Sequence, residues 1–132
     1  MWLDGEWKIV ARVIASVVGG ILFFALATMA MSAVSKELWP EYAAAVADGA
    51  YTLPMLWSRL VSGAAATIFA TWLAVMLGKQ NLKTGFLIGV SLLVLNILWH
   101  VNIWDKYPVW YHLTWFAIIM PSALLGGRLA RR

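Results

Sequence analysis

The sequence predicts an all-α integral membrane protein in which four transmembrane helices form an antiparallel bundle. Hydrophobic residues make up 63% of the 132-residue chain and charged residues only 12%, whereas soluble domains carry about 25% charged residues. Charged side chains also divide the sequence into four uncharged runs, at residues 13–35, 60–78, 84–104 and 107–127. Each run has roughly the 20 residues that a membrane-spanning helix needs, and barrel strands are about half that length. Helices are therefore expected.

No linker rich in glycine, serine or proline divides the chain, so residues 1–132 are expected to form a single domain. The predicted spans are residues 9–35, 55–78, 84–104 and 108–128. Pro108 suits the first turn of the fourth helix, and Pro121 should release a carbonyl near Ala117. Because the turns at residues 79–83 and 105–108 are short, the second, third and fourth helices should be antiparallel neighbours.

The one long connection, residues 36–59, contains the segment WPEYAAAVADG. Pro40 stands where a first helical turn would begin and Gly49 where the helix would end, which predicts a short helix. Trp39, Tyr42 and Tyr51 lie close to it in the sequence. We expect this helix to lie along the outer membrane interface.

Lysine and arginine are unevenly distributed between the two sides of the predicted bundle. The termini and the middle loop hold Lys8, Arg12, Lys79, Lys83, Arg128, Arg131 and Arg132, and the other two loops hold only Lys36, Arg59 and Lys106. By the positive-inside rule both termini are predicted to be cytoplasmic. A plasma membrane is the expected location, with a bacterial inner membrane as the first expectation.

A cleaved signal peptide is the alternative interpretation of the first span. Its uncharged stretch is longer than a typical signal-peptide core, and Asp4 and Glu6 dilute the positive charge before it. We therefore predict an uncleaved anchor.

Small residues recur every four positions in several spans, and close packing of such residues is what joins helices inside lipid. The predicted seams are Ser58, Ser62, Ala66, Ala70, Ala74 and Gly78 in the second span, Ala11, Ala15 and Gly19 in the first, and Ser122, Gly126 and Ala130 in the fourth. In the third span Gly85, Gly89, Asn96 and His100 share one stripe, which should face the bundle interior.

The candidate site combines polar residues of three spans at one predicted depth. His100, His112 and Arg59 each lie about one helical turn, roughly 6 Å, inside the outer boundary. Polar groups at membrane depth are costly and often functional. We predict an outer-side ligand pocket formed by Arg59, Asn96, His100 and His112. The aromatic rim above it is Trp104, Tyr107, Trp110 and Tyr111.

Structural roles are the alternatives for the same residues. Tryptophan and tyrosine mark membrane interfaces without binding a ligand. Arg59 could extend its long side chain to the headgroups. It could also pair with one of three acidic residues in the first outer loop, Asp48, Glu41 or Glu37. Asn96 could join two helices by a hydrogen bond.

Four functions are compatible with these features. The first is binding of a lipid, a quinone or another small molecule with oxygen acceptors, since Arg59 supplies a forked donor, the histidines can donate or accept hydrogen bonds, and tryptophan packs against flat rings. The second is a non-catalytic accessory or scaffold subunit of a larger membrane complex. The third is a redox protein with haem b held by His100 and His112. The fourth is a channel or transporter, which would need a homo-oligomer because four helices enclose little volume.

Other classes lack the residues that they require. We predict no catalytic residues, no metal ligands and no cofactor apart from the haem alternative. The small multidrug transporters are similar in length and helix count, but they depend on a membrane glutamate, and no span here contains a carboxylate. The absence of cysteine excludes disulfides and thiolate catalysis. The net charge of +4 sits at the ends of apolar runs, so nucleic acid is not expected as a partner.

Overall fold

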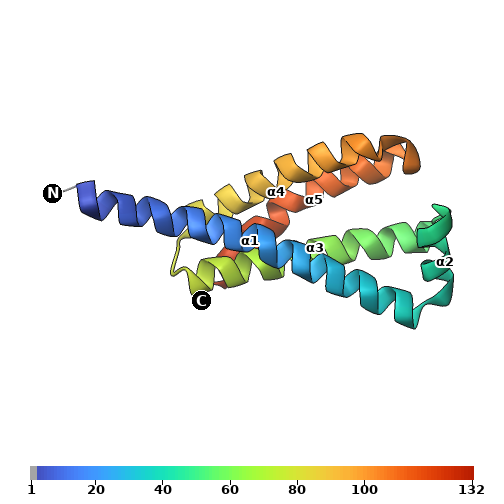
Figure 1. The fold of residues 1–132 in the computed structure, drawn as a ribbon, viewed down its shortest axis with the longest axis horizontal. Helices are drawn as coiled ribbons and strands as arrows, with labels where there is room; N and C mark the ends of the chain where they lie inside the picture. Colours follow the sequence, from blue (N-terminus) through green and yellow to red (C-terminus); the bar gives the residue numbers. More distant parts are fainter. Residues whose placement is uncertain (1–2) are drawn as a thin grey trace.

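The computed structural model describes residues 3–132, so residues 1 and 2 of the predicted domain lie outside the described part (Figure 1). The elements are α1 (Leu3–Leu38), α2 (Pro40–Asp48), α3 (Leu53–Leu77), α4 (Leu82–Asn102), the 3-10 turn η1 (Trp104–Lys106) and α5 (Val109–Leu129), and residues 3–132 contain no strand. Four helices, α1, α3, α4 and α5, are long and apolar enough to cross a membrane. The predicted all-helical fold with four apolar spans is confirmed at that level.

Local signals set most of the helix boundaries. Pro40 begins α2, and Gly49 ends it with a left-handed φ of 71°, its N–H donating to the Ala45 carbonyl. Asn81 caps α4 by accepting a 3.3 Å hydrogen bond from the Thr84 N–H. Pro108 is the N-cap residue immediately before α5, one position ahead of the first-turn place predicted for it, and α5 continues through Pro121.

The α4–α5 connection differs from the prediction. The third span was expected to reach residue 104, but α4 ends at Asn102 and the chain then tightens into η1. This turn reverses the chain within a few residues. It therefore returns the first turn of α5 to the side of the last turn of α4.

The helices converge at one end of the molecule and diverge at the other (Figure 1). The start of α1, the C-terminus and the turn between α3 and α4 gather toward one end, and α2 and η1 lie at the opposite end. We call the latter the α2 end. Helix α3 contacts both α1 and α5 extensively, and α4 packs mainly on α5. Helices α1 and α4 separate toward the α2 end (Figure 1).

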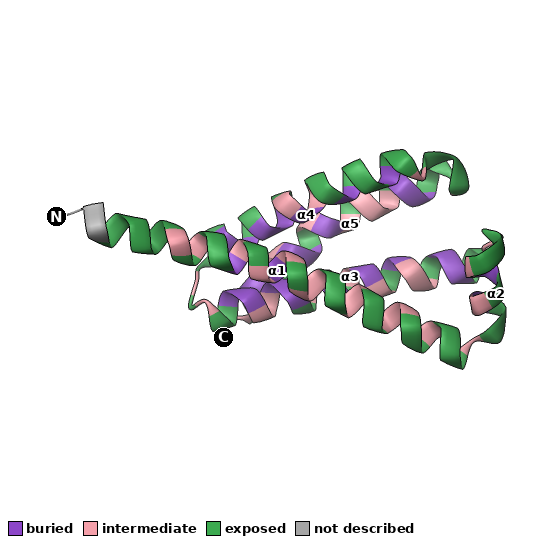
Figure 2. Cartoon of the chain, in the orientation of Figure 1, coloured by how far each residue is buried: buried purple, intermediate pink, exposed green. Residues whose placement is uncertain are grey.

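Buried side chains concentrate where α3, α4 and α5 meet, whereas α1 is mostly exposed (Figure 2). The largest core cluster consists of Ala74, Val75, Ile88, Leu92 and Ile119. Large apolar side chains on the outward surfaces of all four long helices are exposed. Apolar surface of this extent suits contact with lipid.

The predicted small-residue seams are partly confirmed. Ala66, Ala70 and Ala74 are buried, but Ser58 and Ser62, at the start of the same seam, are only half-buried and line a pocket. In α4 the whole stripe Gly85, Gly89, Asn96 and His100 is buried, as predicted.

The seam predicted in α1 was wrong by one position. Ala15 is exposed and Gly19 only partly buried, whereas the adjacent Gly20 is buried against α4. A Cβ atom at Gly20 would lie 2.9 Å from Cγ2 of Ile88, so a larger residue here would force Ile88 or the helices to shift. A helix of 3.6 residues per turn leaves a one-residue ambiguity in a pattern of period four.

Candidate functional site

The two histidines of the chain form a pair at the α2 end. His100 on α4 and His112 on α5 are both buried, and their Nδ1 atoms lie 2.7 Å apart. The second ring nitrogen of His112, Nε2, lies 3.0 Å from the backbone carbonyl oxygen of Trp104. The η1 turn makes both contacts possible because it presents that carbonyl to the start of α5.

The hydrogen-bond partners define the protonation of the neutral pair. A carbonyl oxygen only accepts, so Nε2 of His112 carries the proton and donates to Trp104. Its Nδ1 is then an acceptor, and Nδ1 of His100 donates to it. Nε2 of His100 is left with an unshared electron pair. The histidine pair therefore offers a ligand one hydrogen-bond acceptor, Nε2 of His100, and no ring N–H donor, because both N–H groups are already used.

A second pair of side chains lies one helical turn deeper. The indole Nε1 of Trp115 donates to Oδ1 of Asn96 over 2.9 Å, and the Asn96 amide donates to the Leu92 carbonyl over 2.8 Å. The Trp115 ring also stacks on His100, with centroids 5.6 Å apart. Asn96 thus joins α4 to α5, as its structural alternative predicted, and it supports the indole beneath the histidines.

Arg59 lies among all four tyrosines of the chain. Its Nε donates to the hydroxyl of Tyr111, and its Nη1 donates to the hydroxyls of Tyr42 and Tyr51, at 3.1, 3.1 and 3.5 Å. Its guanidinium carbon also lies 5.0 Å from the ring centroid of Tyr51 and 5.5 Å from that of Tyr107. We call these four residues the tyrosine cage.

The tyrosine cage gives Arg59 neutral partners. Every hydrogen bond that Arg59 makes within the described residues goes to a phenol and none to a carboxylate. The predicted alternative of an ion pair with Asp48, Glu41 or Glu37 is therefore wrong. Burial raises the pKa of the Tyr107 phenol, although the positive charge of Arg59 opposes this shift. Tyr107 therefore stays neutral at physiological pH.

The predicted aromatic rim separates into three different roles. Tyr107 and Tyr111 belong to the tyrosine cage. Trp104 stacks on His112 with centroids 4.4 Å apart and covers the histidine pair. Trp110 is exposed; its ring pairs with Trp57 at 5.8 Å and meets the Tyr111 ring edge-on at 6.2 Å.

A groove of about 640 Å³ lies between α1 and α4 at the α2 end. Its polar lining includes Arg59, Asn96, His100, Tyr111 and Trp115, so three of the four predicted site residues border it. Its apolar lining comes from the two diverging helices and from the residue that follows α4: Ile21, Phe24, Ala25, Met29, Leu92, Leu95, Trp99 and Ile103. His112 does not line the groove and lies fully buried, bonded to His100.

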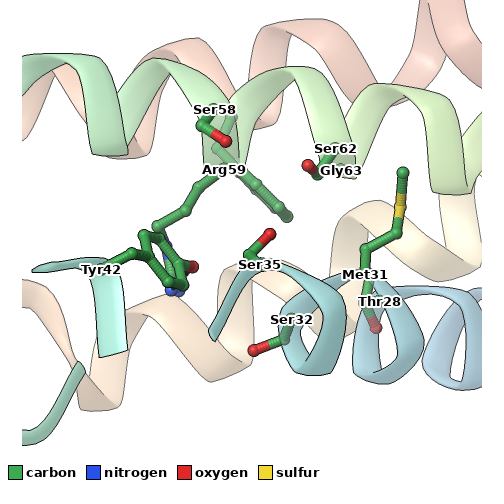
Figure 3. A pocket seen from close by; sticks show the side chains of 10 residues that line it. Thr28, Met31, Ser32, Ser35, Tyr42, Ser58, Arg59, Ser62 and Gly63 are labelled. Carbon is green, nitrogen blue, oxygen red and sulfur yellow. Dashed lines mark hydrogen bonds between the residues drawn. The ribbon is translucent and has the colours of Figure 1, made fainter. Parts of the chain in front are cut away.

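A smaller pocket of about 120 Å³ lies between α1 and α3 (Figure 3). Five of its lining residues carry aliphatic hydroxyls: Thr28, Ser32 and Ser35 of α1, and Ser58 and Ser62 of α3. Arg59 lines this pocket too and extends from α3 toward Tyr42 of α2. Thr28, Arg59 and Trp115 line both cavities.

The histidine geometry argues against the haem alternative. Two axial ligands must present one nitrogen each from opposite faces of the porphyrin. Here the two Nδ1 atoms lie 2.7 Å apart, too close for a porphyrin between them, and Nε2 of His112 already bonds to a carbonyl. Among the described residues no three histidine, aspartate or glutamate side chains converge on a common point either.

Comparisons with protein-family models, curated proteins and solved structures found no match to this chain. Its function is therefore inferred from the site. The residues that the sequence prediction missed are the hydroxyl groups of the small pocket and two members of the tyrosine cage, Tyr42 and Tyr51. The spacing of Thr28, Ser32 and Ser35 places them on one helical face. The same spacing is typical of small residues that pack two helices together, so it did not distinguish a pocket from a packing seam.

Proposed function

We propose that this protein binds an amphipathic small molecule, such as a lipid or a quinone, in the groove between α1 and α4. The observation that carries the proposal is the composition of the groove. One side consists of apolar side chains from two diverging helices, and the other presents Arg59, Asn96, His100, Tyr111 and Trp115. Its volume of about 640 Å³ falls within the ordinary range for ligand pockets.

The polar side of the groove supports recognition of a headgroup. The acceptor on Nε2 of His100 suits a hydroxyl donor, such as a glycerol or a quinol hydroxyl. Trp115 is held in place by Asn96 and presents an indole face to a flat or aliphatic group. An amphipath would place its headgroup here and its chain along the apolar residues of α1 and α4.

The membrane arrangement is part of this proposal. We infer an antiparallel bundle in a plasma membrane with both termini in the cytoplasm, because the positive charges favour that side. The α2 end then faces outward. A ligand would enter the groove sideways from the outer leaflet, so the molecule needs no aqueous channel.

Blocking the groove tests the proposal. Ala25 lines the groove and is exposed, so Ala25→Phe should fill it. Ala30→Phe is the matched control, because Ala30 is an exposed alanine of the same helix that lines neither cavity. The purified protein would be mixed separately with dioctanoylglycerol, dioctanoyl phosphatidic acid and decylubiquinone, and binding measured by native mass spectrometry.

The expected result is binding of at least one amphipath that Ala25→Phe abolishes and Ala30→Phe preserves. A second variant, with Arg59, His100 and His112 all changed to glutamine, should also lose binding while still being expressed. Equal binding by the two phenylalanine variants, or unchanged binding by the triple variant, would refute the groove as the site.

The other candidate functions stay predictions without a specific observation in their favour. The small-residue seams of α3 and α5 are mostly filled within the chain: Ala66, Ala70, Ser122 and Gly126 are buried against neighbouring helices. The seams therefore give no particular support to an accessory or scaffold subunit.

A further inference from the structure

Resting on the proposed function, we infer that the ligand carries an oxyanion, a phosphate or a carboxylate, that binds Arg59 in the small hydroxyl-lined pocket. The groove would then hold the ligand's apolar chain. Quinones, which are uncharged, would be excluded as the preferred ligand.

The charge of Arg59 is the first reason. Its guanidinium is always protonated, and its hydrogen bonds within the described chain all go to neutral phenols. A charge held away from water is costly unless an opposite charge compensates it. An oxyanion in the adjoining pocket would provide that charge, and guanidinium bonds to phosphate and carboxylate are among the strongest in proteins.

The hydroxyl groups are the second reason. In the part of the chain that the structure describes, three helical hydroxyls bond back to their own helix, Thr28 to Phe24, Thr67 to Gly63 and Ser91 to Leu87, whereas the buried hydroxyl of Thr71 has no partner. The hydroxyls of Ser32, Ser35, Ser58 and Ser62 form no such bond with another described residue. Ser35 of α1 and Ser58 of α3 face the space between these helices (Figure 3). Hydroxyl donors from two helices beside a guanidinium form an environment suited to an oxyanion.

Size and position are the third reason. The pocket of about 120 Å³ is too small for a drug-sized molecule, but it suits one small charged group. Thr28, Arg59 and Trp115 line both this pocket and the groove. A ligand whose oxyanion contacts Arg59 could therefore extend its chain past Trp115 between α1 and α4.

Two matched lipids test the inference. Dioctanoyl phosphatidic acid and dioctanoylglycerol carry the same chains and differ only in the phosphate, so their affinities isolate its contribution. Inorganic phosphate, added as a competitor, separates a free oxyanion from a lipid headgroup. The protein would be studied as the full chain by native mass spectrometry, as wild type and as Arg59→Gln. Arg128→Gln is the control, because Arg128 is an exposed cation at the other end of the molecule.

The wild type and Arg128→Gln should bind phosphatidic acid at least about tenfold more tightly than dioctanoylglycerol, the usual effect of a charged hydrogen bond. Arg59→Gln should bind the two lipids equally. Displacement by inorganic phosphate would identify a free oxyanion as a sufficient ligand. If inorganic phosphate does not displace the lipid, but phosphatidic acid binding still depends on Arg59, the oxyanion belongs to the lipid headgroup.

A serine variant keeps the test decisive if Arg59→Gln does not fold. Ser58→Ala with Ser62→Ala should weaken phosphatidic acid severalfold without changing dioctanoylglycerol binding. Ser91→Ala should change neither, because that hydroxyl bonds within α4. No effect of the double serine variant would overturn the inference.

Failure of the inference is distinguishable from failure of the proposed function. If the two lipids bind the wild type equally and Ala25→Phe blocks both, the groove is a binding site and the oxyanion inference is wrong. If neither lipid nor decylubiquinone binds, both are wrong.

Discussion

Gly63 should control the position of Trp115, the side chain shared by the groove and the small pocket. A Cβ atom at Gly63 would overlap Cη2 of the Trp115 ring and lie 2.7 Å from its Cζ3. Carbon atoms pack at about 3.5 to 4.0 Å. In Gly63→Ala the indole must therefore move by roughly 1 Å, or the two helices must separate.

This movement would break a hydrogen bond. The Trp115–Asn96 bond is 2.9 Å long, and an added shift of roughly 1 Å takes it beyond hydrogen-bond range. Overpacking costs about 1 to 3 kcal/mol, and the lost bond costs about 1 kcal/mol more. We expect Gly63→Ala to lower the free energy of unfolding by about 2 to 4 kcal/mol.

Denaturant unfolding in detergent, followed by tryptophan fluorescence, measures this change. Gly19→Ala is the matched control, because a Cβ there would meet its nearest neighbour, Phe23, at 3.9 Å, an ordinary contact. It should be neutral or slightly stabilising, since alanine favours a helix over glycine. If Gly63→Ala is as stable as Gly19→Ala, the packing described for Trp115 is wrong. In the double variant Gly63→Ala/Trp115→Phe the shorter ring should relieve the overlap, so the two effects should not add.

Three further predictions concern the polar groups around the groove. His112→Phe should destabilise the protein by about 1 to 3 kcal/mol, because it leaves a buried histidine and a carbonyl without their partner, and thermal unfolding measures this. Tyr42→Phe should destabilise more than Tyr51→Phe, because their hydroxyls lie 3.1 and 3.5 Å from Nη1 of Arg59, and equal losses in denaturant unfolding would contradict that ranking. The raised pKa of Tyr107 means that its contribution to stability is complete below the unfolded pKa of about 10 and declines as the pH rises above it. Unfolding measured against pH should therefore depend less on pH above about 10 in Tyr107→Phe than in wild type, and identical profiles would count against the burial of this phenol.

Much of the helical framework could be predicted from the sequence because its causes are local. Run length and charge placement indicated the four long helices, and proline and glycine indicated both ends of α2. The common depth of His100 and His112 also followed from local counting, since each lies about one turn from its helix end. Their direct contact at 2.7 Å agrees with that expectation.

The hydrogen-bond partners of Arg59 could not be predicted in the same way. Arg59 could have extended to the headgroups or paired with a carboxylate, and the sequence contains both options. Tyr42 and Tyr51 looked like interfacial aromatics, yet they bond to Arg59 because α2 folds back over the start of α3. Which residue fills the place beside a charge depends on the positions of several helices at once.

The period-four pattern of small residues shows most clearly what the sequence could not predict about helix packing. Along α3 the pattern continues unchanged from Ser58 to Ala74, but Ala66 to Ala74 pack against other helices and Ser58 and Ser62 line a pocket. The sequence therefore specified the number of long helices, their approximate positions and the distance of the two histidines from their helix ends, which depend on neighbours within a few residues. The tertiary structure decided which face of each helix is packed and which borders the groove, because the separation of α1 from α4 depends on how all the helices pack together.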